Sequence, residues 1–269
     1  MNDKQWEVFC KFRDEFKAKC KEWEKLAPQL CDLQIQSAKK DTPDYPLENP
    51  IVYNTSLDSI TQNDEINLIV IGDNPGKNEQ LEKNKKYLVG MAGKIAQGFF
   101  ARNPELATDF RKNVIILNKT PVHTAKTNHL KYLIKNGSNE IHKLIHDSQI
   151  WMAEKTARLH QDFLSAQNND NCGVPRAMEV WLVGYAELKN NGLFTPYKKS
   201  FFNAYKNNSD KVQPDKMLKA WNRVKVFQHF SMNRFSIDLN DFIAKNKINS
   251  LSEAIEKLGE LHKKEIFTS

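Results

Sequence analysis

Residues 68–76 read LIVIGDNPG, an apolar run of four residues that stops at the turn sequence GDNPG. A continuous apolar run, without alternation, predicts a strand that is buried on both faces. Glycine, asparagine and proline close together predict a tight turn directly after it. The stretch therefore indicates a parallel sheet in an α/β fold. It leaves open whether the turn is only a connection or part of a functional site.

Further runs of the same character appear along the chain, and we expect four buried strands, at 66–71, 114–117, 180–183 and 224–227. Helical patterns separate them, near 92–101, along 139–166 and, in a shorter form, near 214–221. Strands that alternate with helices form mainly parallel sheets with helices on both faces. The sequence therefore predicts an α/β three-layer sandwich around a central, mainly parallel four-stranded sheet.

The two ends of the chain also have helical patterns. Aromatic and other apolar residues recur every three or four positions over 5–35, which predicts an amphipathic helix with a core-facing seam. Pro28 is expected to interrupt or cap this helix, and a polar, proline-rich connection should follow at 39–50. Residues 250–253 read SLSE, the capping-box pattern of a C-terminal helix. We expect an N-terminal helical extension over 1–45, packed on an α/β domain over 46–269.

The composition is that of a soluble globular protein, with a net charge of +7. This charge suits a polyanionic partner, but most of it comes from lysine, which A·T-rich coding also favours. No apolar run approaches the roughly 20 residues needed to span a bilayer. The N-terminus lacks the apolar segment of a secretory signal. We therefore expect a cytoplasmic protein with no membrane contact, and the charge alone does not establish nucleic-acid binding.

Neither the cysteines nor the histidines predict a metal site. The four cysteines, at 10, 20, 31 and 172, lack metal-ligand spacing, and free buried thiols are the simpler interpretation. His142 and His146 lie four residues apart on a predicted helix and could share a metal. Because no third ligand is in view, a solvated helix face is the stronger interpretation. We expect no metal and no structural disulfide.

Polar residues follow each of the predicted strands. After the first strand comes the loop 72–76, and the later strand ends carry Asn118, Gly184, His229, Ser231 and Arg234. Ligands of open parallel sheets bind outside the carboxyl ends of the strands. We therefore expect these residues to meet at one site.

In their order along the chain, these motifs resemble the uracil-DNA glycosylase superfamily. The loop GDNPG at 72–76 is similar to the family's first motif, which reads GQDPY, GxNPG or GEAPG in different branches. YLVGMAG at 87–93 is similar to the family's PFVGxAG segment, and IILNKTP at 115–121 to its strand that ends in the base-reading Asn. HFSMNRF at 229–235 is similar to its HPSxxR loop, and PIVYN at 50–54 to the VYNP segment of its single-strand-selective branch. The resemblance covers residues 50–236 or thereabouts.

The resemblance implies a monofunctional hydrolase that cleaves the N-glycosidic bond of uracil, or of a related deaminated base, flipped out of DNA. It implies no cofactor and no metal. Asn74 is implied to orient the attacking water, while Asp73 could act as a base or stabilise positive charge on the sugar. Asn74 is favoured because the loop is closer to GxNPG. His229 is implied to donate a hydrogen bond to uracil O2 as negative charge develops there.

The resemblance also implies residues that bind the base and the DNA backbone. Asn118 offers one acceptor and one donor, the complement of uracil N3–H and O4. The other implied base-binding residues are Gly72, Tyr87 and Leu88, and the implied phosphate-binding residues are Pro75, Gly76, Ser231 and Arg234. Two positions depart from the family: Leu88 replaces the stacking Phe, which leaves Tyr87 or another aromatic for that role, and Phe230 replaces a Pro, which suggests a differently shaped loop.

Two other functions stay open. The departures at Leu88 and Phe230 would suit a catalytically inactive, nucleic-acid-binding member of the same fold. The same crevice could also serve an α/β enzyme that acts on a free nucleotide or base derivative. For the glycosylase we expect a monomer with uracil-containing DNA as its partner, single- or double-stranded.

Overall fold

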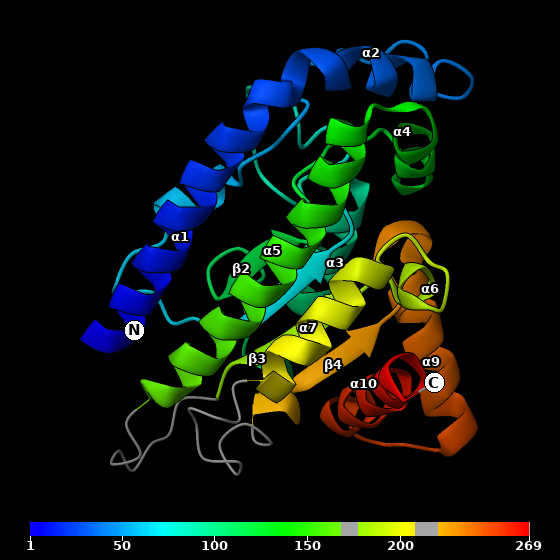
Figure 1. The fold of residues 1–269 in the computed structure, drawn as a ribbon. Coiled ribbons are helices and arrows are strands. Elements are labelled where there is room, and N and C mark those ends of the chain that lie inside the picture. The colour runs from blue at the N-terminus through cyan, green and yellow to red at the C-terminus, as the bar shows by residue number, and fades with distance from the viewer. Residues whose placement is uncertain (168–176, 208–219, 269) are drawn as a thin grey trace.

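The computed structural model describes residues 1–167, 177–207 and 220–268 (Figure 1). Its centre is one sheet of four strands: β1 (Leu68–Gly72), β2 (Val114–Asn118), β3 (Glu179–Val183) and β4 (Val224–Phe227). All neighbouring strands are parallel, in the spatial order β2-β1-β3-β4. The four expected strands and the parallel sheet are therefore confirmed.

The strand order places a topological switch point between β1 and β3. The chain runs from β1 outward to β2 on one side, and then crosses to β3 on the other side of β1. Connections therefore leave the carboxyl ends of β1 and β3 in opposite directions, which opens a crevice between them. Gly72 pairs with Asn118 at the carboxyl ends of β1 and β2, so the two strands end level with each other.

One face of the sheet is covered by long helices that run beside one another. Figure 1 shows α5 (Asn139–Ser165) and α7 (Thr195–Asn207) side by side, with α1 (Asp3–Trp23) next to α5. The expected aromatic seam of α1 faces inward, and Phe16 stacks on Trp151 of α5 with ring centroids 5.8 Å apart. Burying such large rings removes 150–250 Å² each from water. The interpretation of this seam as core is confirmed.

The opposite face packs against α3 (Met91–Arg102), α9 (Arg234–Asn246) and α10 (Leu251–Phe267). The buried ring of Trp181 on β3 lies 5.4 Å from Phe100 of α3 and 5.9 Å from Phe235 of α9, measured between centroids. Helices thus cover both faces, and the chain is an α/β protein with an all-parallel central sheet. The continuous apolar strands follow from this arrangement, because neither face meets water.

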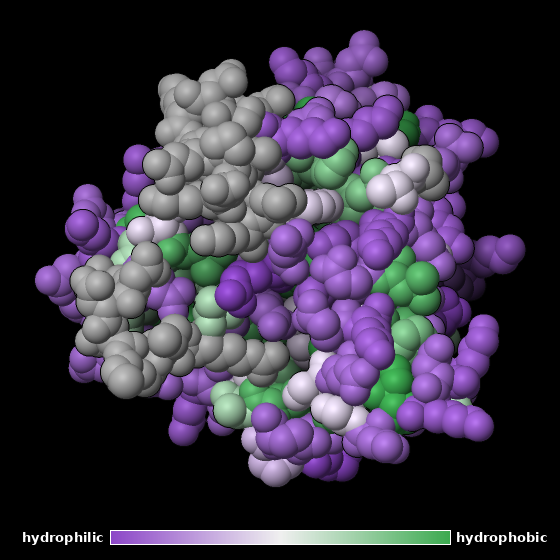
Figure 2. Space-filling model, turned by 90° about the horizontal axis from the view of Figure 1, so that it is seen from below, coloured by the Kyte–Doolittle hydropathy of each residue, from purple (hydrophilic) through white to green (hydrophobic). Residues whose placement is uncertain are grey.

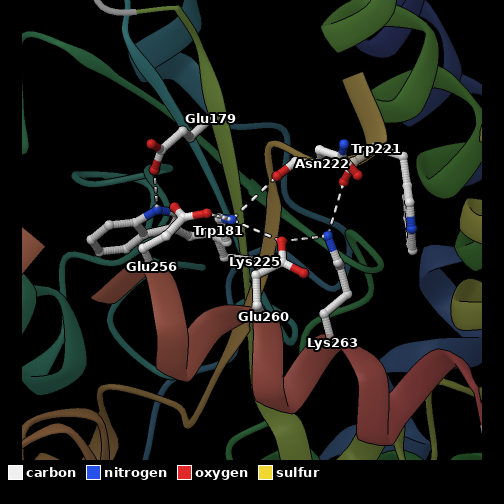
Figure 3. Close-up of polar contacts among 8 residues, drawn as sticks. All are labelled: Glu179, Trp181, Trp221, Asn222, Lys225, Glu256, Glu260 and Lys263. Atoms are coloured by element: carbon white, nitrogen blue, oxygen red, sulfur yellow. Dashed lines mark hydrogen bonds and ion pairs between the residues drawn. The ribbon is translucent and has the colours of Figure 1, made fainter. Parts of the chain in front are cut away.

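A network of ion pairs fastens α10 to β4 (Figure 3). The buried Lys225 of β4 pairs with Glu256 and, at 2.8 Å, with Glu260, and it donates to the Asn222 carbonyl at 3.2 Å. Lys263 pairs with the same Glu260 at 2.6 Å. Because the ammonium of Lys225 has three acceptors, its charge is compensated although it lies inside the protein.

The N-terminal helical region is broken where the sequence predicts. A short 3-10 turn follows α1, and α2 (Ala27–Ala38) begins with Pro28 in its first turn. Phe9, Phe12 and Phe16 belong to the same hydrophobic core as the strands, so the N-terminal helices are packed on the rest of the chain. A domain boundary between 45 and 46 stays a prediction.

Some elements were not expected from the sequence, namely α4 (Leu130–Asn136), α6 (Tyr185–Leu188), α7 and α9. Lysine and asparagine interrupt the apolar period in α4, α7 and α9, and α6 is only four residues long. Ser250 caps α10 as expected, accepting from the Glu253 amide at 3.4 Å. The expected helix at 214–221 falls mostly outside the described residues, and Cys172 lies outside them altogether. Cys10, Cys20 and Cys31 are free thiols, and Cys20 is buried.

The face of the molecule seen from below is largely polar (Figure 2). Figure 2 shows one face on which hydrophilic side chains predominate and hydrophobic ones lie between them. Within the described residues, none of the helices combines the length and the apolar character that crossing a bilayer requires.

Candidate functional site

A cavity of about 560 Å³ opens at the carboxyl edge of the sheet. Its lining residues come from five segments: 73–74 with 76–79, 88 with 90–92, 124–127, 184 with 186–187, and 228–229 with 231, 232 and 234. Four of these follow the ends of the four strands, so segments after all four strands meet at the cavity, as a parallel sheet predicts. The crevice between β1 and β3 lies at its centre, where Asp73 and Gly184 both line the wall.

Asn74 is held in one orientation by its own amide nitrogen. Nδ2 donates to Thr124 Oγ1 at 2.8 Å and to the carbonyls of Val122 and Pro75 at 3.3 and 3.4 Å. All of these hydrogen bonds use the nitrogen, which identifies the other amide atom as the oxygen. The carbonyl oxygen Oδ1 is therefore the atom of Asn74 that is available to accept a hydrogen bond from water in the cavity.

Asp73 is buried against a lysine that lies behind it. Its Oδ1 is 2.5 Å from Nζ of Lys119, whose side chain is fully buried. Lys119 Nζ also donates to the carbonyl of Val183 at 2.6 Å and to that of Gly72 at 3.3 Å. The ammonium thus joins the carboxyl ends of β1, β2 and β3.

Gly184 leaves the space that this ion pair needs. Its φ is +95°, a conformation that side-chain-bearing residues rarely adopt. A Cβ at this position would lie 2.2 Å from Asp73 Oδ1, well inside van der Waals contact. Glycine is therefore required at the end of β3 both for the backbone angle and for the close approach of the carboxylate.

His229 has a defined tautomer when neutral. Its Nδ1 accepts a hydrogen bond from the backbone N–H of Ser231 at 3.1 Å, and Ser231 Oγ lies 2.8 Å from the same nitrogen. Because the backbone N–H can only donate, the ring proton is on Nε2. Burial lowers the pKa of His229, and Lys119 and Arg234 lower it further while Asp73 opposes them. The ring therefore offers a neutral Nε2–H donor in the cavity wall.

Glu79 joins two of the segments that form the cavity. Its buried carboxylate accepts from the Gly76 amide at 2.9 Å, and it also interacts with the backbone of Leu88 and Val89. Burial raises the pKa of Glu79 to about 7, although these backbone groups and Arg111 act in the opposite direction. Glu79 thereby fixes the distance between the GDNPG loop and the segment that carries Leu88.

Three of the four residues with implied base-binding roles, Gly72, Tyr87 and Asn118, lie outside the cavity lining of the described residues. Asn118 is buried beside Gly72, where a Cβ on Gly72 would lie 2.5 Å from Asn118 Oδ1, and its Nδ2 has no described hydrogen-bond partner. Tyr87 is buried with its hydroxyl donating to the Val52 carbonyl at 2.5 Å, so its ring belongs to the core. Gly72 contributes close packing and no side chain to the site.

The two departures from the family pattern have structural explanations. Leu88 lines the cavity with its backbone at φ +50°, where Arg111 donates to its carbonyl at 2.6 Å. Phe230 is fully buried against Phe235, with centroids 4.8 Å apart. Its φ is −66°, the value that proline fixes, so the backbone of this loop keeps the proline-like angle at position 230. The expectation of a differently shaped loop stays a prediction.

The phosphate-binding candidates divide into two groups. Ser231 and Arg234 line the cavity, and Arg234 is exposed at the start of α9. Gly76 also lines it, but its N–H is bonded to Glu79, and the buried Pro75 carbonyl accepts from His123 Nδ1 at 2.8 Å and from the Thr124 amide at 3.2 Å. Lys77 and Lys126 add positive charge to the cavity wall, and Lys126 is paired with Asp41.

Sequence reasoning missed Lys119, Glu79 and Thr124. A lysine directly after a continuous apolar strand was the available signal for Lys119, because a charged residue there must find a partner at the strand end. Glu79 and Thr124 lie in loops, where no periodicity reveals the direction of a side chain. Only their contacts in the structure identify them.

In the part of the chain that the structure describes, no group of three or more His, Cys, Asp or Glu side chains is arranged to hold a metal ion. His142 and His146 are both exposed, and His146 Nδ1 lies 3.1 Å from Asp147. No protein-family model matches this chain, and no curated protein or solved structure matches it either.

Proposed function

We propose that the chain is a monofunctional DNA glycosylase that hydrolyses the N-glycosidic bond of uracil, or of a related deaminated base, flipped out of DNA. The observation that carries this proposal is the pairing of two groups in one cavity. Asn74 presents an amide oxygen to water, and His229 presents an Nε2–H donor. Glycosidic hydrolysis needs one group for the nucleophile and one for the departing base.

The reaction follows from these two groups. Asn74 Oδ1 accepts a hydrogen bond from a water and directs the water's oxygen at the anomeric carbon of the deoxyribose. As the bond from that carbon to uracil N1 breaks, the electron pair passes to the base and charge accumulates on O2. The water oxygen bonds to the anomeric carbon and releases one proton to the surrounding water, so the products are an abasic sugar and a uracil anion that is protonated in solution. The Nε2–H of His229 stabilises this charge, a contribution of roughly 10²–10³ in rate at comparable anion sites. Because the ring is neutral, the hydrogen bond forms without transfer of the proton.

The wall of the cavity also suits a nucleic acid. Lys77, Lys126 and Arg234 bring cationic side chains to it, and the whole chain carries a net charge of +7. Such groups bind phosphates without reading sequence. Ser231 follows His229 closely enough to contact a phosphate beside the flipped nucleotide.

A second candidate is a nucleic-acid-binding protein of the same fold without glycosylase activity. It is favoured by the lining of the cavity, which among the described residues includes no Phe, Tyr or Trp to stack on a base, and by the position of Asn118 outside it. A third, an α/β enzyme acting on a free nucleotide or base derivative, would use the same cavity without a DNA partner.

Oligonucleotides with a single uracil, hypoxanthine or xanthine, as single strands and duplexes, distinguish the three. We expect release of at least one of these bases, detected as alkali-labile strands, and losses of roughly 10²-fold or more for Asn74→Ala and His229→Ala. Asn246→Ala on α9 and His146→Ala on α5 are matched controls that change exposed side chains elsewhere. Salt-dependent DNA binding without base release would support the second candidate. Absence of binding at low salt would support the third.

A further inference from the structure

The ion pair behind the cavity bears on which residue of the GDNPG loop handles the water. Asp73 and Asn74 are neighbours in the chain, and both line the cavity. Their side chains, however, have different surroundings. The Asn74 amide is fixed through its nitrogen and keeps its oxygen available, whereas Asp73 Oδ1 is bound to Lys119.

Lys119 has as many acceptors as it has protons to donate. Nζ reaches Asp73 Oδ1 at 2.5 Å, the Val183 carbonyl at 2.6 Å and the Gly72 carbonyl at 3.3 Å. An ammonium group has three N–H bonds, so this set satisfies it completely. The ring of Phe194 lies 4.9 Å from Nζ and covers the cation further.

These contacts connect the strand ends that build the cavity. Lys119 follows β2, Gly72 ends β1 with Asp73 directly after it, and Val183 ends β3. The lysine therefore spans the switch point between β1 and β3 from behind. Gly184 lies on the other side of Asp73 Oδ1. Because glycine has no side chain, its backbone can approach this oxygen closely.

We propose that Lys119 is a positioning residue that locks Asp73 into the back wall of the cavity, so that Asn74, and not Asp73, directs the water. This inference rests on the proposed glycosylase function. Asp73 Oδ1 lies between the ammonium of Lys119 and the backbone of Gly184, so this oxygen is bound to the protein and does not orient a water in the cavity. The ion pair instead acts on the pKa of His229, which Asp73 raises and Lys119 lowers.

A mutant cycle separates this role from direct catalysis by Asp73. Lys119→Met or Asp73→Asn alone leaves one buried charge without its partner, whereas the double variant leaves none. We expect each single variant to lose about 10²-fold in base release, and the double variant to recover to within about tenfold of the wild type. Asn74→Ala should keep its loss of roughly 10²-fold or more in every background. If D73N and the double variant are both inactive while N74A is active, Asp73 is the catalytic residue and the proposal is overturned.

Lys225→Met is the matched control. Lys225 is also a buried, ion-paired lysine at the sheet, but its partners are on α10 and it lies outside the cavity lining of the described residues. Its replacement should leave base release per folded molecule within about threefold of wild type, because nothing at the cavity changes. A loss in K225M as large as in K119M would mean that Lys119 acts only through stability.

A second measurement does not depend on activity. The charged groups that act on His229 are Asp73, Lys119 and Arg234, and Glu187 acts on Lys119. NMR titration of the His229 ring should show its pKa higher in K119M than in the wild type, because a nearby cation is lost while Asp73 remains, and close to the wild-type value in the double variant. An unchanged pKa in K119M would overturn the proposal. A wild type that releases no base would instead refute the glycosylase function, whatever the titration shows.

Discussion

Replacing Glu79 tests whether burial controls the charge of the cavity wall. In the folded chain the pKa of Glu79 is raised to about 7 from an ordinary value of 4.5, because the carboxylate is buried. Between these values the folded chain keeps the proton and the unfolded chain loses it. The contribution of Glu79 to stability is therefore fully present below pH 4.5, declines as the pH rises, and is gone above about pH 7.

The magnitude follows from the width of that interval. Each pH unit over which only the folded chain holds the proton corresponds to about 1.4 kcal/mol. From 4.5 to about 7 the sum is roughly 3 kcal/mol. Glu79→Gln keeps the shape of the side chain and an acceptor for the Gly76 amide, but it cannot titrate. The difference in unfolding free energy between wild type and E79Q should therefore shift by about 3 kcal/mol against the wild type as the pH rises through this range.

Urea denaturation of both proteins at several pH values gives this difference directly. The difference must be used, because burial lowers the pKa of His123 and of His160 to about 4, and both histidines therefore add stability as the pH rises. Glu7→Gln on the exposed side of α1 is the matched control. If the wild-type and E79Q curves stay parallel within about 0.5 kcal/mol, as for a surface substitution, the argument from burial fails.

Three further substitutions test other parts of the structure. Gly184→Ala should lower the unfolding free energy by about 2 kcal/mol, because the alanine would have a φ of +95° and a Cβ 2.2 Å from Asp73 Oδ1. An unchanged Tm would contradict this expectation. Lys225→Met should lower the unfolding free energy by about 2 kcal/mol through the loss of its hydrogen bonds to carboxylates, and stability equal to wild type in chemical denaturation would argue against the network of Figure 3. Thr124→Val removes the nearest acceptor of the Asn74 amide, so kcat for base release should fall about tenfold, while Thr124→Ser should retain most of it.

The strands and the principal helices could be predicted from sequence because their signals are local. A strand covered on both faces must be apolar throughout, as residues 68–71 and 114–117 are. The parallel direction of the strands was enough to predict that a candidate site lies at the carboxyl edge of the sheet. The helices α7 and α9 were missed since their buried residues become a recognisable face only against the neighbours that cover them.

The roles of individual side chains at the site depended on tertiary structure. Asn118 and Lys119 are adjacent at the end of β2, and the sequence analysis selected Asn118 as the candidate base-binding residue. In the fold Asn118 is packed against Gly72, while Lys119 reaches across to β1 and β3 and pairs with Asp73. Strand order, unlike strand identity, decides which groups a side chain at a strand end can reach.

What the sequence by itself determined was a parallel α/β fold with polar residues after each strand. Hydrophobic continuity and turn chemistry are properties of short segments, so they can be read without knowing the neighbours. What only the tertiary structure decided was how the turn after residues 68–71 is used. There Asn74 is oriented by Thr124, and Asp73 is held by Lys119. Both partners are more than 40 residues away, and hydrogen bonds over such separations exist only once the strands are assembled.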